Sequence, residues 1–149
     1  MRFISNSPDQ TINIARALAA SIDGGAVIAM TGDLGAGKTA FTRGLAEGLN
    51  CPCEVSSPTF AIVHEYAGGR LPLYHFDMYR VNSWDSLYST GFFDYMDSGA
   101  VLAVEWSENI ENALPDSLIA VDIRRGENDN QRIITITARG EQKLENISC

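Results

Sequence analysis

The segment GDLGAGKT, from Gly32 to Thr39, satisfies the pattern G-x-x-x-x-G-K-[ST] in full. Glycines in such a loop let successive backbone N–H groups curl around a phosphate, and the helix that follows adds the positive end of its dipole. Lys38 is placed to reach the β- and γ-phosphates, and the hydroxyl of Thr39 to ligate Mg²⁺. The segment therefore predicts a binding site for a nucleoside triphosphate with its magnesium ion.

Phosphoryl transfer also needs a carboxylate that holds the metal or its water shell, and a group that orients the attacking water. Two acidic residues follow apolar runs: Asp77 lies near the end of LPLYHFDMY, and Glu105 comes directly after AVLAV. Buried strands would deliver both acids to the C-terminal edge of a sheet, beside the phosphate loop. An acid at a strand end is otherwise an ordinary solvated residue, but two of them behind apolar runs favour a functional role. Which of the two touches the metal directly stays open.

Other polar and aromatic residues have two interpretations each. Thr59 lies 21 residues beyond Lys38 within SSPTF. A threonine on a loop at this separation can sense Mg²⁺ and the γ-phosphate, although Ser-Ser-Pro-Thr is also an ordinary turn. Trp106 is suited either to stacking on a nucleotide base or to half-buried packing. His64 and His75 lack metal-ligand spacing, so we expect each to be a sheet histidine with its hydrogen bonds satisfied.

The elements that must position these residues follow from hydrophobic periodicity. Ser7 and Pro8 have the layout of a helix start, and a helix of about three turns is expected after Lys38. Ser83 to Met96 is expected to be helical, with an interruption at Gly91. Short apolar or β-branched runs predict the strands Ala26 to Thr31, Thr59 to Tyr66, Leu71 to Tyr79, Ala100 to Val104, Leu118 to Ile123 and Arg132 to Ala138. The second and third of these are expected to form an antiparallel hairpin.

A buried strand that feeds a glycine-rich loop and then a helix is the context that a P-loop requires. Together with the strand pattern it predicts an α/β fold, a P-loop NTPase-like three-layer sandwich with a mixed, mostly parallel central sheet. The chain has 149 residues, of which 45% are hydrophobic, and this suffices for the core of one ordinary domain. We therefore expect residues 1–149 to form a single P-loop ATPase domain.

Charge, hydropathy and cysteines exclude several classes of protein. The chain carries 19 acidic and 11 basic residues, a net charge of −8, whereas proteins that grip nucleic acid unaided usually carry a basic stripe. Tight direct binding to RNA or DNA is therefore not expected. No apolar run approaches the roughly 18 residues of a membrane helix and no signal-peptide layout is present, which predicts a cytosolic protein. The cysteines fit neither a disulfide framework nor a zinc site and are expected to be reduced: Cys51, Cys53 and Cys149.

Four motifs in order, GDLGAGKT, SSPTF, HFDMYR and VEW, resemble the bacterial TsaE (YjeE) family, the small ATPase of the tRNA threonylcarbamoyladenosine (t6A) modification pathway. The resemblance runs from about Thr11 to Pro115. It implies that ATP is the nucleotide, that the metal lies near Thr39, Asp77 and Glu105, and that catalysis rests on Lys38 with the two acids. The implied nucleotide-binding positions are Asp33, Leu34, Gly35, Ala36, Gly37, Lys38, Thr39, Ala40, Thr59 and Trp106.

Members of the TsaE family work with the partner proteins TsaD and TsaB, which carry out the threonylcarbamoyl transfer itself. The resemblance thus implies that the partner, and not this acidic chain, holds the tRNA. One stretch departs from the family pattern, because Asn82 to Ser86 stands where many relatives have a more acidic run. This departure concerns contacts of that helix and leaves the nucleotide site intact.

Two other functions share the phosphate loop. A small-molecule kinase usually closes an arginine-rich lid over the transferred phosphate, and the candidates here are Arg43, Arg80 and the pair Arg124 and Arg125. A GTPase-like switch commonly uses an N-K-x-D segment, and neither lysine of the chain lies in one. We therefore favour an Mg²⁺-dependent ATPase over both of these functions. Its intrinsic hydrolysis should be slow, since no arginine is obviously placed to stabilise the transition state.

Overall fold

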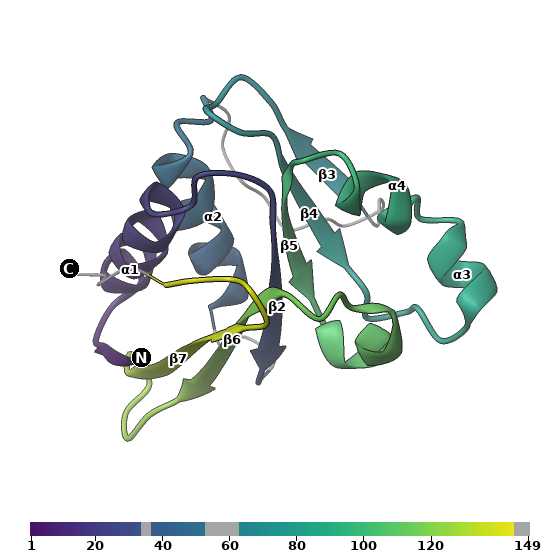
Figure 1. The fold of residues 1–149 in the computed structure, drawn as a ribbon. Helices are drawn as coiled ribbons and strands as arrows, with labels where there is room; N and C mark the ends of the chain where they lie inside the picture. The colour runs from purple at the N-terminus through teal and green to yellow at the C-terminus, as the bar shows by residue number, and fades with distance from the viewer. Residues whose placement is uncertain (34–36, 53–62, 145–149) are drawn as a thin grey trace.

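The computed structural model describes residues 1–33, 37–52 and 63–144 and arranges them around a seven-stranded sheet (Figure 1). The strands lie side by side in the order β1-β7-β6-β2-β5-β4-β3. Their bounds are β1 Arg2–Ser5, β2 Ala26–Gly32, β3 Val63–Tyr66, β4 Leu73–Asp77, β5 Val101–Glu105, β6 Leu118–Arg125 and β7 Arg132–Arg139. The four central strands β6, β2, β5 and β4 run parallel, whereas β1 and β7, β6 and β7, and β3 and β4 pair antiparallel. The central strands therefore all end at the same edge of the sheet.

Helices cover both faces of this sheet. Their bounds are α1 Pro8–Ala20, α2 Lys38–Gly48, α3 Trp84–Tyr88, α4 Phe92–Met96 and the 3₁₀ helix η1 Ser107–Ala113. Figure 1 shows α1 and α2 together on the left of the strands and α3 and α4 on the right. Among the described residues, no helix has the length and apolar character that crossing a membrane requires.

The helix α1 fixes the position of α2. It begins as the sequence predicts, with the Ser7 hydroxyl accepting a hydrogen bond from the N–H of Gln10 at 3.2 Å and Pro8 in the first turn. Side chains would not fit between the two helices at Gly44 and Gly48, because a methyl group at either position would overlap backbone atoms of α1. The two helices therefore pack closely, and the N-terminus of α2 is held in place by α1 and the sheet.

The hydrophobic core is divided by the sheet into two layers. Along β2, Ile28 and Met30 contribute to the layer under α1 and α2, whereas Val27 and Ala29 contribute to the opposite layer. The helical residues of the first layer include Ile14, Leu18, Phe41 and Leu45, and those of the second include Leu87, Phe92 and Ile110. Burial of β2 on both faces explains its continuous apolar sequence.

Most of the expected elements are present, and the three-layer α/β sandwich is confirmed. The hairpin is confirmed for β3 and β4, although the first part of the predicted strand Thr59 to Tyr66 lies outside the described residues. The expectation of a mostly parallel sheet holds for the four central strands, since three of the six pairings between described strands are antiparallel. The interrupted helix over Ser83 to Met96 is also confirmed, with Gly91 before α4 at φ 77°. The sequence did not predict β1 or η1.

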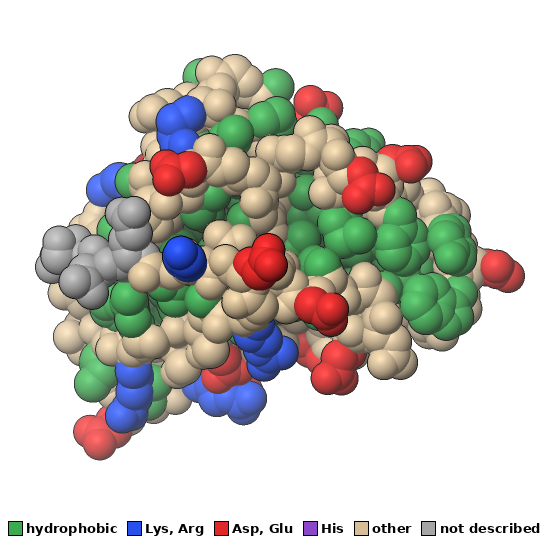
Figure 2. Space-filling model, in the orientation of Figure 1, with side chains coloured by type: hydrophobic (Ala, Val, Ile, Leu, Met, Phe, Trp, Pro, Cys, Tyr) green, Lys and Arg blue, Asp and Glu red, His purple; other side chains and the backbone are tan. Residues whose placement is uncertain are grey.

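The surface shown in Figure 2 is divided by side-chain type. Lysine and arginine side chains gather on the left and lower parts of this view, while the right-hand part, over α3 and α4, shows hydrophobic and acidic side chains. Two of the exposed large side chains belong to α3, since Trp84 is 53% and Tyr88 64% exposed. The side of the molecule that carries α3 thus lacks the basic stripe typical of nucleic-acid binding in the view of Figure 2.

Of the described glycines in the loop region, Gly32, the last residue of β2, is expected to be the least tolerant of substitution. Its φ is 134°, and a methyl group there would overlap the carbonyl oxygen of Ile123 on β6. Replacing Gly32 by alanine should lower the free energy of unfolding by about 3 kcal/mol or more, from backbone strain and overlap together. Urea unfolding followed by circular dichroism measures this change.

The matched control is Gly24→Ala, because a methyl group at Gly24 meets no atom within 4 Å. That substitution should change the free energy of unfolding by less than about 1 kcal/mol. Equal stability of the two variants would contradict the close approach of β2 and β6 at Gly32.

Candidate nucleotide-binding site

The predicted phosphate loop leaves the sheet at the end of β2 and enters α2 at Lys38. Gly37 precedes the helix with a left-handed backbone, φ 105°, which glycine adopts without steric strain. The Nζ atom of Lys38 donates a hydrogen bond to the carbonyl oxygen of Gly32 at 3.3 Å, and the lysine is only 6% exposed. Thr39 and Ala40 follow in the first turn of α2, both half-buried. Four predicted nucleotide-binding positions lie outside the described residues: Leu34, Gly35, Ala36 and Thr59.

Trp106 brings the end of β5 to the same lysine. Its ring centroid lies 4.2 Å from Nζ of Lys38 and 5.0 Å from the ring centroid of Tyr79. Its backbone is left-handed, with φ 57°, a conformation that costs a non-glycine residue about 1–3 kcal/mol and is found most often at functional sites. The indole is half-buried and packs against the second core layer. Stacking on a nucleotide base stays a prediction.

The two predicted acids lie opposite each other on neighbouring parallel strands. Asp77 at the end of β4 is the register partner of Glu105 at the end of β5, and Glu105 is also the partner of Met30 on β2. Both acids therefore stand at the edge where the chain leaves β2 towards Lys38. They differ in exposure, because Glu105 is 7% exposed and Asp77 is half-buried. Their chemical roles remain predictions.

Ser107 and Asn109, which the sequence analysis did not identify, help to hold the strand ends together. The hydroxyl of Ser107 donates a hydrogen bond to the carbonyl oxygen of Met30 at 3.1 Å. The amide of Asn109 donates to the carbonyl oxygen of Met78 at 2.8 Å, which ties η1 to the segment after β4. Oδ1 of Asp77 accepts a hydrogen bond from the backbone N–H of Tyr79 at 3.0 Å and is fixed by it. The sequence signal for the contacts of Ser107 and Asn109 was weak, since serine and asparagine within a few residues of a strand end are ordinary turn residues.

His75 corrects one expectation from the sequence. The histidine is fully buried, yet neither of its ring nitrogens has a hydrogen-bond partner among the described residues. Its Nε2 atom lies 3.2 Å from Oε1 of Glu105, which likewise has no hydrogen bond there. The distance suits an ion pair, but the ring does not direct an N–H at the oxygen. The prediction of a satisfied sheet histidine was therefore wrong for His75, because periodicity cannot reveal the neighbour across the sheet.

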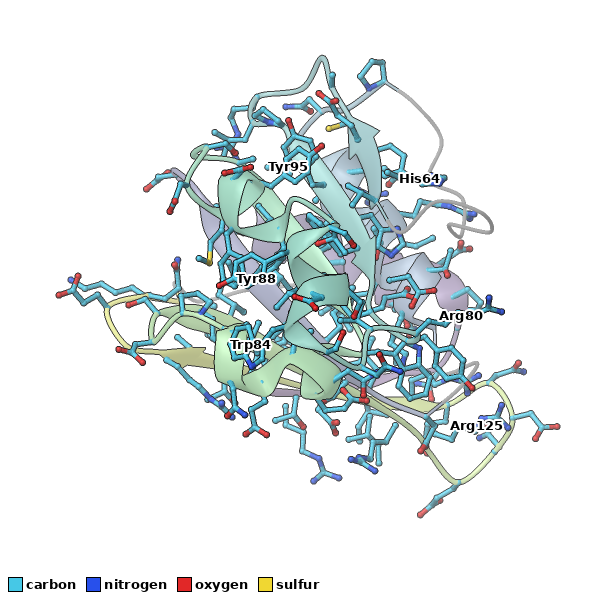
Figure 3. All side chains as sticks on the ribbon, turned by 90° about the vertical axis from the view of Figure 1, so that its right-hand side faces the viewer. His64, Arg80, Trp84, Tyr88, Tyr95 and Arg125 are labelled. Carbon is cyan, nitrogen blue, oxygen red and sulfur yellow. The ribbon has the colours of Figure 1, made fainter. Side chains whose placement is uncertain are left out.

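On the β6 side, Asp122 connects Thr31 at the end of β2 to Arg124 on its own strand. Its carboxylate accepts hydrogen bonds from the hydroxyl of Thr31 at 2.8 Å and from Nε of Arg124 at 2.9 Å. The hydrogen bond that Arg124 donates to Asp122, followed by the charge of that carboxylate, raises the pKa of the Arg124 guanidinium above its ordinary value. Figure 3 shows Arg80 and Arg125 towards the right of the view, away from Trp84 and Tyr88. Both arginines are exposed and follow or end parallel strands, so positive charge is present at the edge that carries the loop.

The donors gathered at this edge fit a magnesium nucleotide. Mg²⁺ in nucleotide sites is usually held by one or two carboxylates, a hydroxyl and the phosphates, and it keeps several waters. Thr39 offers the hydroxyl, while Glu105 and Asp77 offer carboxylates on adjacent strands. The buried Oε1 of Glu105, with no hydrogen bond among the described residues, is the kind of atom that a ligand or a neighbouring donor satisfies.

Comparison with known proteins gives one consistent result. The family model for the threonylcarbamoyl adenosine biosynthesis protein TsaE matches residues 5–134. The tRNA threonylcarbamoyladenosine biosynthesis protein TsaE of Bacillus subtilis (strain 168) is 44% identical over 136 residues, which cover 91% of this chain and 84% of that protein. Its counterpart from Treponema pallidum (strain Nichols) is 34% identical over 133 residues, which cover 89% of this chain and 98% of that protein. The crystal structure of Bacillus subtilis YdiB has a TM-score of 0.76 and 39% sequence identity, and covers 94% of this chain and 86% of that one.

Proposed function

Because the chain belongs to the TsaE family of threonylcarbamoyl adenosine biosynthesis proteins, we propose that it is the Mg²⁺-dependent ATPase of that pathway. One observation carries the proposal. The Lys38 end of α2 and the Glu105–Trp106 end of β5 meet at one edge of the sheet, where the indole lies over the lysine Nζ. A phosphate-binding cation and a metal-binding carboxylate are parts that ATP hydrolysis requires, and an aromatic ring is suited to stacking on the base.

In the proposed mechanism, the backbone of the Gly32 to Thr39 loop and the ammonium of Lys38 bind the β- and γ-phosphates. The hydroxyl of Thr39, with Glu105 and Asp77, would hold the ion or its water shell. When bound, Mg²⁺ neutralises charge that develops on the phosphate oxygens. One of the two carboxylates orients a water whose oxygen bonds to the γ-phosphorus while the bond to the β–γ bridging oxygen breaks. ADP leaves with that electron pair, and the water proton passes to the phosphate or to solvent.

The partner proteins supply the rest of the modification chemistry in this proposal. The chain has a net charge of −8, and its α3 side shows hydrophobic and acidic side chains in Figure 2, which favours a protein partner over direct contact with tRNA. We assign tRNA binding and threonylcarbamoyl transfer to the TsaD–TsaB complex. Hydrolysis by the isolated chain should be slow and should rise when that complex is present.

The decisive experiment reconstitutes t6A synthesis from purified TsaD–TsaB, tRNA and the threonylcarbamoyl donor, with and without this chain. With the chain and ATP, each TsaD–TsaB complex is expected to modify many tRNA molecules. Without the chain, or with a non-hydrolysable ATP analogue, synthesis should stop after about one round, because hydrolysis resets the complex. The measurement is moles of t6A formed per mole of complex. Many rounds of modification in the absence of the chain would refute the proposal.

A further inference from the structure

His75, which lies buried against Glu105, is not used by the mechanism above. His75 Nδ1, His75 Nε2 and Glu105 Oε1 all lack hydrogen bonds among the described residues, although Nε2 and Oε1 are only 3.2 Å apart. A buried polar atom left without a hydrogen bond costs about 1–3 kcal/mol. An isolated histidine in an apolar core would lower the stability of the fold and gain no compensating interaction. Because this histidine lies beside a carboxylate at the end of β5, at the proposed nucleotide site, its burial there favours a functional explanation.

The register of the sheet explains why these two side chains meet. His75 on β4 stands opposite Ala103 on β5, and Asp77 stands opposite Glu105. Alternation along each strand therefore puts the histidine and both acids on one face, which is the face that carries α2. The small side chain of Ala103 leaves room over β5 for the imidazole to reach Glu105. Both partners lie on adjacent parallel strands, so their approach follows from the strand pairing.

We propose that His75 is a positioning residue for Glu105. Its Nε2–H donates a hydrogen bond to Oε1 once nucleotide is bound, which leaves the second carboxylate oxygen for the metal or its water. The movement needed is small, because the atoms already lie within hydrogen-bond distance and the terminal torsion of a glutamate is soft. Removing a hydrogen-bond donor that orients a metal ligand commonly lowers metal affinity or activity by about 10- to 100-fold. This inference rests on the proposed function, since it assigns a task to the carboxylate of Glu105.

The test compares His75→Gln with His75→Met. The two side chains have nearly the same shape, but only glutamine keeps an N–H donor close to the position of Nε2. Affinity for ADP is measured by calorimetry with Mg²⁺ and with a chelator. Mg²⁺ should raise the ADP affinity of His75→Met about 10-fold less than that of the wild type, and kcat should fall about 10-fold. For His75→Gln, both quantities should stay within about 3-fold of the wild type. ADP affinity in chelator should be the same for all three proteins.

The matched control is His64, which pairs with His75 across β3 and β4. His64 is half-buried, and its ring lies 6.4 Å from that of Tyr66. His64→Met should leave the Mg²⁺-dependent gain unchanged. A double-mutant cycle adds a second readout, because His75→Met should cause no further loss of that gain in a Glu105→Gln background if the histidine acts through the carboxylate.

The outcomes separate the positioning role from its alternatives. If His75→Met does not fold, His75→Asn takes its place, since its amide is too short to reach Oε1 and should show the same loss. An unchanged Mg²⁺-dependent gain in a folded Met or Asn variant would overturn the role of His75 and leave the proposed function standing. Equal losses in the Gln and Met variants, extending to ADP affinity in chelator, would show a purely structural histidine. A wild-type chain that binds no nucleotide with Mg²⁺ would overturn both proposals.

Discussion

Replacing Lys38 by alanine is expected to abolish ATP turnover and to weaken ATP binding about 10- to 100-fold. The lysine is buried at the start of α2, and its Nζ donates to the carbonyl oxygen of Gly32 beneath the ring of Trp106. In this position the ammonium would lie close to a phosphate bound in the loop. Losing one donor to the transition state typically lowers kcat about 10²- to 10³-fold. Calorimetry measures ATP binding, and release of inorganic phosphate in the presence of the partner complex measures turnover.

The chain offers a matched control for this substitution. Lys143, its other lysine, is exposed after β7, and Lys143→Ala should leave binding and turnover as in the wild type. A thermal melt of Lys38→Ala distinguishes lost phosphate contacts from lost structure. Normal turnover in a folded Lys38→Ala protein would refute the assignment of the ATP site.

Glu105→Gln is expected to separate binding from hydrolysis. Glutamine keeps the shape of the side chain but removes its charge, so the variant should still bind ATP while turnover falls about 10²-fold or more. The effect should be large because Glu105 is almost buried, directly beside β2, and has no hydrogen bond to Oε1 among the described residues. Single-turnover hydrolysis at saturating ATP measures the chemical step without the contribution of binding.

Glu108 on η1 provides the control for the loss of one negative charge. It lies three positions further along the chain and is exposed, and Glu108→Gln should therefore hydrolyse ATP at the wild-type rate. If Glu105→Gln retained full turnover, the task of holding the ion and orienting water would pass to Asp77, its register partner on β4.

Much of the fold was predictable because its signals are local. The continuous apolar run of β2 and the start of α1 at Ser7 each depend on neighbours within a few residues, and both predicted elements are present. The short strand β1 escaped prediction because its four residues have no periodic pattern and it forms only by pairing with β7. Its pairing partner β7 is more than 125 residues away along the chain, and rules based on local sequence do not detect such a pairing.

The site was predictable in part, for a related reason. Lys38, Asp77 and Glu105 could be named because motif spacing and strand ends mark them, and the structure brings them to one edge of the sheet. The contacts that join them depend on register. The approach of the Trp106 ring to the lysine and that of His75 to the glutamate arise between residues about 30 to 70 positions apart, and no spacing rule predicts them.

The pairing of β1 with β7 sets an order of events during synthesis on the ribosome. Arg2 lies opposite Thr135, and the amino group of Met1 donates to the carbonyl oxygen of Ile136. Of the described strands, β1 is synthesised first and its neighbour β7 last, so β1 can pair only after the other strands have been made. Contacts of such long sequence separation form slowly, so the strands that carry the loop and the two acids can assemble before the sheet is completed. β1 must therefore stay unpaired until β7 has been synthesised.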